Sequence, residues 1–156
     1  MNLTGGKAII KPFPGVTANE INHYILAHLK TILPDIVIVN AGSNNISRGH
    51  ILKQNNEEIA EEILNIGLTC RENGVNRIII SGLCYRNSIP LNRKINDINT
   101  ILQNKCSEIN FEFIDNQNIQ VDCHLWKDGL HLNDKGIEIL ANNYLQNLNV
   151  NYNLYD

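Results

Sequence analysis

Short apolar runs alternate with longer amphipathic segments along this chain, and that alternation limits the folds that it can adopt. The runs Asp35–Asn40 (DIVIVN) and Arg77–Ser81 (RIIIS) are short and mostly apolar. Such runs are typical of strands covered on both faces, because a strand with one face in water alternates apolar and polar residues. Strands separated by helices predict a parallel sheet. We therefore expect a three-layer α/β/α sandwich with a parallel, flavodoxin-like sheet.

The same pattern predicts the order of the elements. Strands are expected at Lys7–Phe13, 35–40, 77–81 and Phe111–Asp115, and helices at Thr17–Leu33, Glu57–Glu72, Pro90–Ser107 and Asp134–Leu148. A capping box formed by Thr17 and Glu20 begins the first helix. The second helix is predicted to bury one apolar stripe, formed by Ile59, Ile63, Ile66 and Cys70. Its outer row is predicted to consist of four glutamates, Glu57, Glu58, Glu61 and Glu62. Gly74 is expected to end this helix.

Length and composition fit one globular domain. The chain has 156 residues, of which 43% are hydrophobic and 19% are charged. We expect the domain to span residues 1–148 and residues 149–156 to form a frayed tail. The net charge is −3 and no run of Lys or Arg occurs, which argues against a nucleic-acid partner or an anionic membrane surface. No apolar stretch approaches the roughly 18 residues of a membrane span.

Cysteine usage and the first residues bear on location and cofactors. None of the four cysteines (Cys70, Cys84, Cys106, Cys123) has the two-residue spacing of a zinc or thioredoxin-like site, so we expect no metal and no cofactor. Cys70 and Cys84 are expected to be small buried hydrophobes. The first residues form neither the basic region nor the apolar core of a signal peptide. These features predict an intracellular, cytoplasmic protein.

A candidate acid–base pair precedes the last predicted helix. Ligands of such sheets bind beyond the carboxyl ends of the strands. Asp128 stands three residues before His131, so its carboxylate can reach the imidazole Nδ1–H, fix the tautomer and leave Nε2 as a general base. The other explanation of these residues is structural: a turn aspartate beside a helix-capping histidine.

Two loops supply candidate oxyanion donors. After the strand 35–40, Gly42 permits a tight turn, Asn44 can direct its side-chain amide into the cleft and Asn45 supports the loop. After the strand 7–13, Gly15 can present its backbone N–H. Neutral N–H groups suit a developing oxyanion because they stabilise it without proton transfer. The structural explanations are a loop rich in Gly, Ser and Asn and a Pro-Gly turn before a helix.

Three ordered segments together resemble the SGNH/GDSL hydrolases, particularly the esterase-like domains of some non-LTR retrotransposons. "KPFPGVT" is similar to the family's glycine block, "PDIVIVNAGSNNIS" to its asparagine block and "LWKDGLHLNDKGIEILANNYL" to its Asp–His block. The resemblance implies hydrolysis of a small-molecule carboxylic ester, with His131 as general base and Asp128 as its orienting carboxylate. It also implies that Gly15 and Asn44 donate to the oxyanion. Asn45 stands where the family usually has Asp, and we expect modest consequences.

The family's nucleophile, a serine in a Gly-Asp-Ser block, has no counterpart in these residues. Ser81 ends a strand at the correct edge, but the family gives it no nucleophilic role; the other serines considered lie on other elements (Ser43, Ser47, Ser88). Without that serine, His131 has no hydroxyl to deprotonate, so we expect an N-terminally truncated pseudoenzyme that is inactive as given. The absent strand would lie between the first two predicted strands, which predicts exposed strand edges and marginal stability or self-association.

Two other functions compete with an ester hydrolase. A non-catalytic binding or assembly module, such as a decayed domain of a mobile element, would keep the cleft without turnover. A flavodoxin-like signalling or nucleotide-binding domain is disfavoured, because no Gly-rich phosphate loop and no acidic cluster follow the strands.

Overall fold

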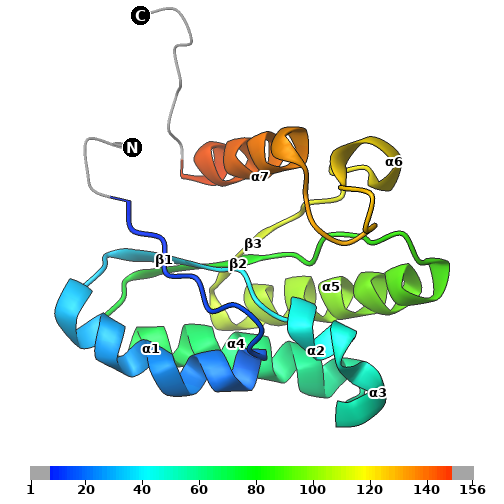
Figure 1. The fold of residues 1–156 in the computed structure, drawn as a ribbon. Coiled ribbons are helices and arrows are strands. Elements are labelled where there is room, and N and C mark those ends of the chain that lie inside the picture. The colour runs from blue at the N-terminus through cyan, green and yellow to red at the C-terminus, as the bar shows by residue number, and fades with distance from the viewer. Residues whose placement is uncertain (1–7, 149–156) are drawn as a thin grey trace, which may run out of the picture.

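A computed structural model describes residues 8–148, which form a parallel sheet with helices on both faces (Figure 1). The described strands lie in the order β1-β2-β3 and are β1 (Ile36–Val39), β2 (Arg77–Ser81) and β3 (Glu112–Ile114). The helices are α1 (Ala18–Ile32), α2 (Ser43–Ser47), α3 (Gly49–Leu52), α4 (Asn56–Glu72), α5 (Ile89–Ile109), α6 (Val121–His124) and α7 (Asp134–Asn147). This arrangement confirms the predicted α/β class with a parallel sheet.

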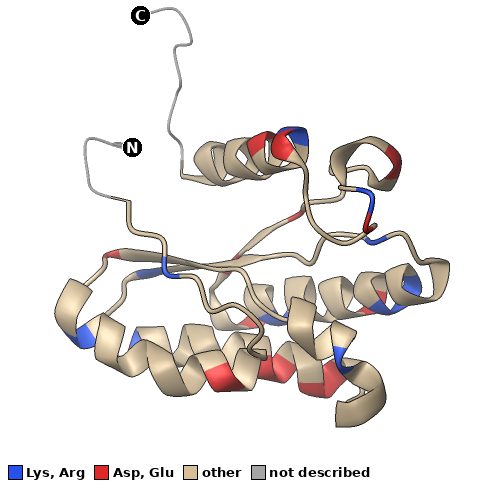
Figure 2. Cartoon of the chain, viewed as in Figure 1, with Lys and Arg blue, Asp and Glu red and all other residues tan. Residues whose placement is uncertain are grey.

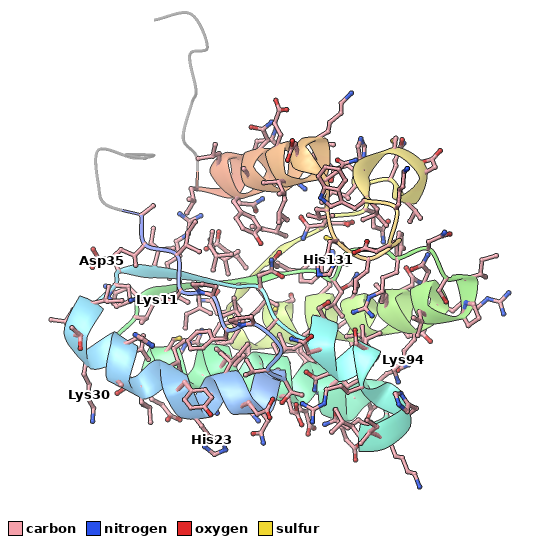
Figure 3. All side chains as sticks on the ribbon, viewed as in Figure 1. Lys11, His23, Lys30, Asp35, Lys94 and His131 are labelled. Carbon is pink, nitrogen blue, oxygen red and sulfur yellow. The ribbon has the colours of Figure 1, made fainter. Side chains whose placement is uncertain are left out.

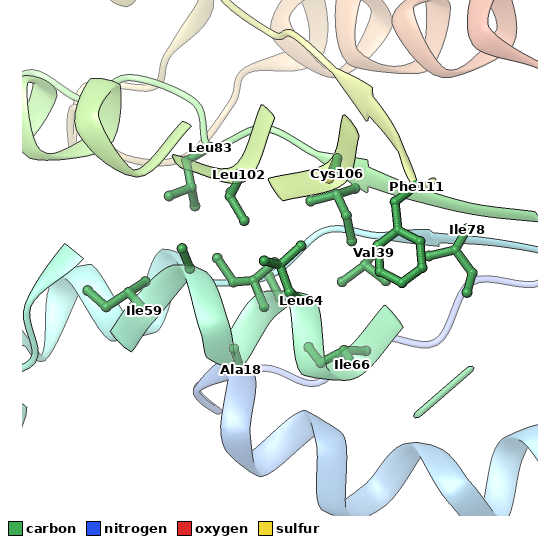
Figure 4. Packing of buried hydrophobic residues seen from close by; sticks show 14 of the residues in the cluster. Ala18, Val39, Ile59, Leu64, Ile66, Ile78, Leu83, Leu102, Cys106 and Phe111 are labelled. Carbon is green, nitrogen blue, oxygen red and sulfur yellow. The ribbon is translucent and has the colours of Figure 1, made fainter. Parts of the chain in front are cut away.

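The main core lies between the sheet and one layer of helices. Helices α1, α4 and α5 cover that face, and α7 with the short α6 lies over the other (Figure 1). The core is built largely from isoleucines of α4 and β2 and from residues of α5 (Figure 4). Ile78 and Ile80 of β2 point into it, whereas Arg77 donates a hydrogen bond of 2.5 Å to the carbonyl of Asn147 in α7. Successive strand residues thus face opposite layers.

The predicted features of α1 and α4 are largely confirmed. The Thr17 hydroxyl accepts from the Glu20 N–H at 3.4 Å, and the Glu20 carboxylate accepts from the Thr17 N–H at 2.5 Å, which completes the capping box. The predicted inner stripe of α4 is buried, and Gly74 follows the helix with φ +89°. Glu62 is an exception to the predicted outer row: it is half-buried, because its carboxylate accepts hydrogen bonds from two side-chain amides.

The expected first strand is wrong. Residues 8–13 form no strand, and Lys7 lies outside the described residues. Ile10 is 88% exposed, and the segment makes no backbone hydrogen bond to β1. Pro12 has no N–H to donate to a ladder, and neither does Pro14 just beyond the segment. Residues 8–13 therefore add no strand to the described sheet.

Strand β1 consequently has an open edge within the described chain. The Arg77 N–H donates to the Asp35 carbonyl at 3.1 Å. The backbone N–H and C=O groups of every second residue, Asp35, Val37 and Val39, therefore face β2. The backbone N–H and C=O groups of Ile36 and Ile38 therefore point away from β2, and no described residue forms a hydrogen bond with these groups. Ile36 is also 41% exposed. The expected coverage of this strand on both faces is only partial: Ile36 is exposed, Val39 is buried, and α7 packs against β3.

Candidate active site

Asp128 and His131 form a hydrogen-bonded pair in the loop between α6 and α7. Figure 3 labels His131 in this loop. Asp128 Oδ2 lies 2.5 Å from His131 Nδ1. The other carboxylate oxygen accepts from the backbone N–H groups of Leu130 at 2.9 Å and of His131 at 3.0 Å. Gly129 has φ +67°, a backbone conformation that favours glycine, and it lets the chain fold back around the carboxylate.

This geometry keeps Asp128 ionised and leaves one imidazole nitrogen free. The hydrogen bond to His131, followed by the two backbone N–H groups, lowers the pKa of Asp128 to about 2. A carboxylate beside Nδ1 favours the tautomer with its proton on Nδ1. The His131 side chain is 72% exposed, and no described residue bonds to its Nε2. The pair can therefore accept a proton at Nε2 from a group that approaches from solvent.

Short-range contacts hold this loop in place. Leu125 and Leu132 form an antiparallel bridge, and Asn133 caps α7 by accepting from the Gly136 N–H at 2.9 Å. The Asn133 amide also donates to the Cys123 carbonyl at 2.9 Å. The cap is thus Asn133, and Asp134 is the first residue of the helix. The loop is thus anchored at both ends.

The structure brings Gly15 and Asn44 close to each other. The Asn44 side-chain amide donates to the carbonyl of Val16, next to Gly15, at 2.8 Å. This bond uses one amide hydrogen and leaves the second available, since an asparagine amide carries two. Gly15 is exposed with φ +77°, and no described backbone carbonyl accepts from its N–H. The two predicted oxyanion donors therefore lie in adjacent loops.

Gly42 and Asn45 shape the loop that carries Asn44. Gly42 has φ +101°, and a Cβ there would come within 2.7 Å of Ile63 Cδ1, so only glycine fits this turn. Asn45 is fully buried, and its carbonyl oxygen accepts from the Ala18 N–H at 2.9 Å. Its amide donates to Glu62 at 2.7 Å and to Gln54 at 2.9 Å. Asn45 thus links α1, α2 and α4 rather than facing a ligand.

Arg86 is a residue of this region that the sequence analysis missed. It is 7% exposed, and its guanidinium donates to the Ser43 hydroxyl at 2.8 Å and to the Ser47 hydroxyl at 2.9 Å. Burial lowers the pKa of this guanidinium. The next residue, Asn87, donates its N–H to the Gly129 carbonyl at 2.9 Å. The segment after β2 thus bridges the Asn44 loop and the Asp128–His131 loop, and its place after a strand was the signal available.

Four of the five serines of the described region make hydrogen bonds elsewhere in the fold, and the fifth, Ser107, is exposed on α5. Ser81 is 1% exposed, and its hydroxyl accepts from the Asn116 amide and from the Tyr144 hydroxyl, both at 2.9 Å. Burial raises the pKa of Tyr144 to about 12. Ser43 and Ser47 hold Arg86, and Ser88 caps α5. None of these hydroxyl groups bonds to His131.

Two hollows of the described surface lie away from the Asp128–His131 pair. One of about 350 Å³ lies along the first turns of α5 and is lined by Tyr85, Ile89, Asn92, Arg93, Asn96 and Asp97. Another, of about 220 Å³, lies around Asn45 and Glu62. The pair is hydrogen-bonded and exposed, and its hydrogen bond lowers the pKa of Asp128. The chemistry of these two side chains therefore marks the candidate site. It lies on an open surface.

The rest of the described chain adds little to the chemistry of this surface. Lys and Arg are scattered over several elements (Figure 2). Within residues 8–148, no group of three or more His, Cys, Asp or Glu residues could hold a metal ion. In the same region, no helix combines the length and the apolar character needed to cross a membrane.

Comparisons with known proteins agree with this fold. The structure of a catalytic mutant of an acetylxylan esterase from Geobacillus stearothermophilus is similar to the chain, with a TM-score of 0.74 and 20% identity over 88% of this chain and 69% of that one. A carbohydrate esterase of family 3 from Talaromyces cellulolyticus gives a TM-score of 0.73 and 21% identity over 86% of this chain and 67% of that one. No curated protein matches the chain. Residues 14–144 match the GDSL-like lipase/acylhydrolase family, and the chain belongs to that family.

Proposed function

We propose that the Asp128–His131 pair is the acid–base unit of a carboxylic ester hydrolase site. The observation that carries this proposal is the 2.5 Å contact between Asp128 Oδ2 and His131 Nδ1, together with a solvent-facing Nε2. The Geobacillus enzyme has catalytic mutants at a serine, an aspartate and a histidine, and its aspartate and histidine are three positions apart, as here. That common spacing supports the assignment.

In the proposed site, Gly15 and Asn44 hold the carbonyl oxygen of the ester. The backbone N–H of Gly15 and the second amide hydrogen of Asn44 would donate to this oxygen as it gains negative charge. The hydrogen bond from Asn44 to Val16 supports this role, because it fixes one donor loop against the other. Arg86 acts as a positioning residue, because its guanidinium donates hydrogen bonds to Ser43 and Ser47 of α2, the helix that carries Asn44.

No Gly-Asp-Ser segment occurs in the 156 residues, so the proposed site has no serine nucleophile of its own in this chain. We expect the chain as given to form no acyl-enzyme, and His131 to transfer protons only when another hydroxyl is supplied. The mobile-element origin, the cytoplasmic location and the single-domain boundary at residue 148 that the sequence suggests stay predictions.

An added alcohol tests the proposed base. Acyl transfer from p-nitrophenyl acetate to trifluoroethanol should be about 100-fold faster with the wild-type chain than with His131→Ala, because a positioned base contributes roughly 100-fold or more. His50→Ala, which removes an exposed histidine on α3, is the matched control and should behave as wild type. Equal rates for the wild type and His131→Ala would exclude the proposed role.

A fluorophosphonate label tests the expected lack of a nucleophile. This reagent forms a covalent bond with activated serines, so the wild-type chain should remain unlabelled. Labelling that His131→Ala abolishes would show that one of the chain's serines is activated by this histidine.

A second candidate function is assembly through the open edge of β1. The outward backbone groups of Ile36 and Ile38 support it, because an unpaired edge can accept another strand. In this second candidate function, two copies of the chain pair through β1, and the Asp128–His131 pair is kept without turnover. Sedimentation velocity tests this second candidate function, because it measures self-association of the chain.

A further inference from the structure

Trp126 lies directly opposite His131 in the loop between α6 and α7. The antiparallel bridge between Leu125 and Leu132 sets the register, and the Trp126 N–H donates to the His131 carbonyl at 2.8 Å. Residues directly opposite each other in an antiparallel pair present their side chains on the same face, with Cβ atoms about 4.5–5.5 Å apart. The backbones of Trp126 and His131 are therefore hydrogen-bonded neighbours, and this register would direct both side chains to the same face of the short hairpin.

The exposure of the two residue pairs shows which way they face. Leu125 and Leu132 are half-buried, whereas Trp126 is 55% exposed and the His131 side chain is 72% exposed. Because successive residues alternate between the two faces, the leucine pair faces the protein and the Trp126–His131 pair faces solvent. A single exposed apolar residue is ordinary on a protein surface. Trp126 is distinguished by sharing its face with the proposed base.

Acid–base chemistry decides which part of an ester would meet this indole. Nε2 of His131 takes the proton of a hydroxyl nucleophile, such as an alcohol, as the new bond between that oxygen and the acyl carbon forms. It returns the proton to the ester oxygen as the bond from the acyl carbon to the alcohol oxygen breaks, and a neutral alcohol leaves. The leaving oxygen must therefore lie within hydrogen-bonding reach of Nε2, while the carbonyl oxygen faces Gly15 and Asn44.

We infer that Trp126 is a specificity-determining residue that binds the alcohol portion of the ester and favours alcohols that carry a ring. This inference rests on the proposed function of the Asp128–His131 pair. An indole offers a large flat face, and stacked or edge-on ring pairs gain more than their buried area alone provides. We expect this contact to strengthen binding about five-fold, within the two- to ten-fold range of such pairs.

Binding to the indole can be measured without turnover. The chain has one tryptophan, so its indole N–H gives a single NMR signal. Phenyl acetate should shift this signal and bind about five-fold more tightly than ethyl acetate, which has the same acyl group without the ring. Methyl benzoate, with its ring on the acyl side, should show no such advantage.

Variants assign the preference to the side chain. Trp126→Ala should remove the difference between phenyl and ethyl acetate, as followed on the His131 imidazole signals, and Trp126→Phe should retain most of it. Ile137→Ala is the matched control, since Ile137 is 54% exposed on α7 and should not affect the ratio. Circular dichroism of each variant checks that it is folded.

The outcomes separate this inference from the proposed function. If esters shift the His131 signals but phenyl and ethyl acetate bind equally, or Trp126→Ala leaves their ratio unchanged, the inference is wrong and the proposed function stands. Tighter binding of methyl benzoate through Trp126 would also overturn it, because the indole would then contact the acyl portion. If no ester shifts either residue, both proposals fail.

Discussion

At the scale of single residues, Asn44 and Asn45 have different roles because they have different hydrogen-bond partners. Asn44 is partly exposed and donates one amide hydrogen to the Val16 carbonyl. Its second amide hydrogen can therefore still be donated to a ligand. Asn45 is fully buried and uses its carbonyl oxygen and both amide hydrogens on Ala18, Gln54 and Glu62. The family's usual Asp at this position would face the Glu62 carboxylate without an N–H to offer.

Asn45→Asp should therefore destabilise the protein by about 2–4 kcal/mol near pH 7, because it replaces two buried N–H donors with a charge beside Glu62. Like charges raise the pKa of one carboxyl, so the loss should shrink as the pH falls through that raised value. Urea unfolding at pH 7 and pH 5 measures both effects. Asn45→Asp combined with Glu62→Gln should recover stability; no recovery would contradict this account.

The pKa of Asp128 gives a second test at this scale. The hydrogen bond to His131 is the largest cause of its lowering to about 2, so His131→Ala should raise this pKa toward the ordinary value near 3.9. Because the folded-state pKa is depressed, the ionised carboxylate stabilises the fold above about pH 4, and this contribution is lost as the pH falls toward 2. The carboxyl ¹³C signal of Asp128 should titrate at lower pH in the wild type than in His131→Ala. Identical titrations would mean that the two do not interact in solution.

At the scale of elements, the long helices follow local sequence and the short ones do not. The predicted ranges of α1, α4, α5 and α7 agree with the structure to within about two residues, because each combines a periodic apolar face with a capping residue. Helices α2, α3 and α6 were not predicted. Each has four or five residues, too few for a periodic pattern, and is held by contacts with distant segments such as the bonds from Arg86 to α2.

The turn between β1 and α2 depends on Gly42. Gly42→Ala should destabilise the protein by about 2–4 kcal/mol, because it combines a left-handed backbone with a Cβ 2.7 Å from Ile63. Gly74→Ala is the matched control: it has φ +89° but open space around it, and should cost about 1–2 kcal/mol. Thermal and urea unfolding measure both variants. A smaller loss at Gly42 than at Gly74 would contradict the tight packing of this turn.

At the scale of the whole molecule, the open edge of β1 is the main unsatisfied feature of the described chain. Two outward-facing residues, Ile36 and Ile38, leave backbone groups without a described partner. No charged residue or proline lies within β1, although such residues commonly protect edge strands from pairing. We therefore predict self-association through this edge, and the prediction rests on the sheet topology rather than on surface charge.

Ile36→Lys should weaken self-association about ten-fold or more, because a charge at the edge opposes pairing with a second strand. Sedimentation velocity over a range of protein concentrations measures the association constant. Ile51→Lys is the control, since Ile51 is 65% exposed on α3, away from the edge. Monomeric wild-type protein at all concentrations, or equal effects of the two substitutions, would exclude β1 as an interface.

The sequence by itself determined the α/β class, the long helices, the family and the Asp128–His131 spacing, because these depend on local periodicity, capping and contacts only three residues apart. Only the tertiary structure decided that residues 8–13 form no strand, that Asn45 is buried against Glu62 and that Arg86 connects the candidate loops. A strand needs a neighbour to pair with, and a buried polar side chain needs a partner from elsewhere in the chain. Whether such a partner exists is a property of the assembled fold, which no local pattern of residues contains.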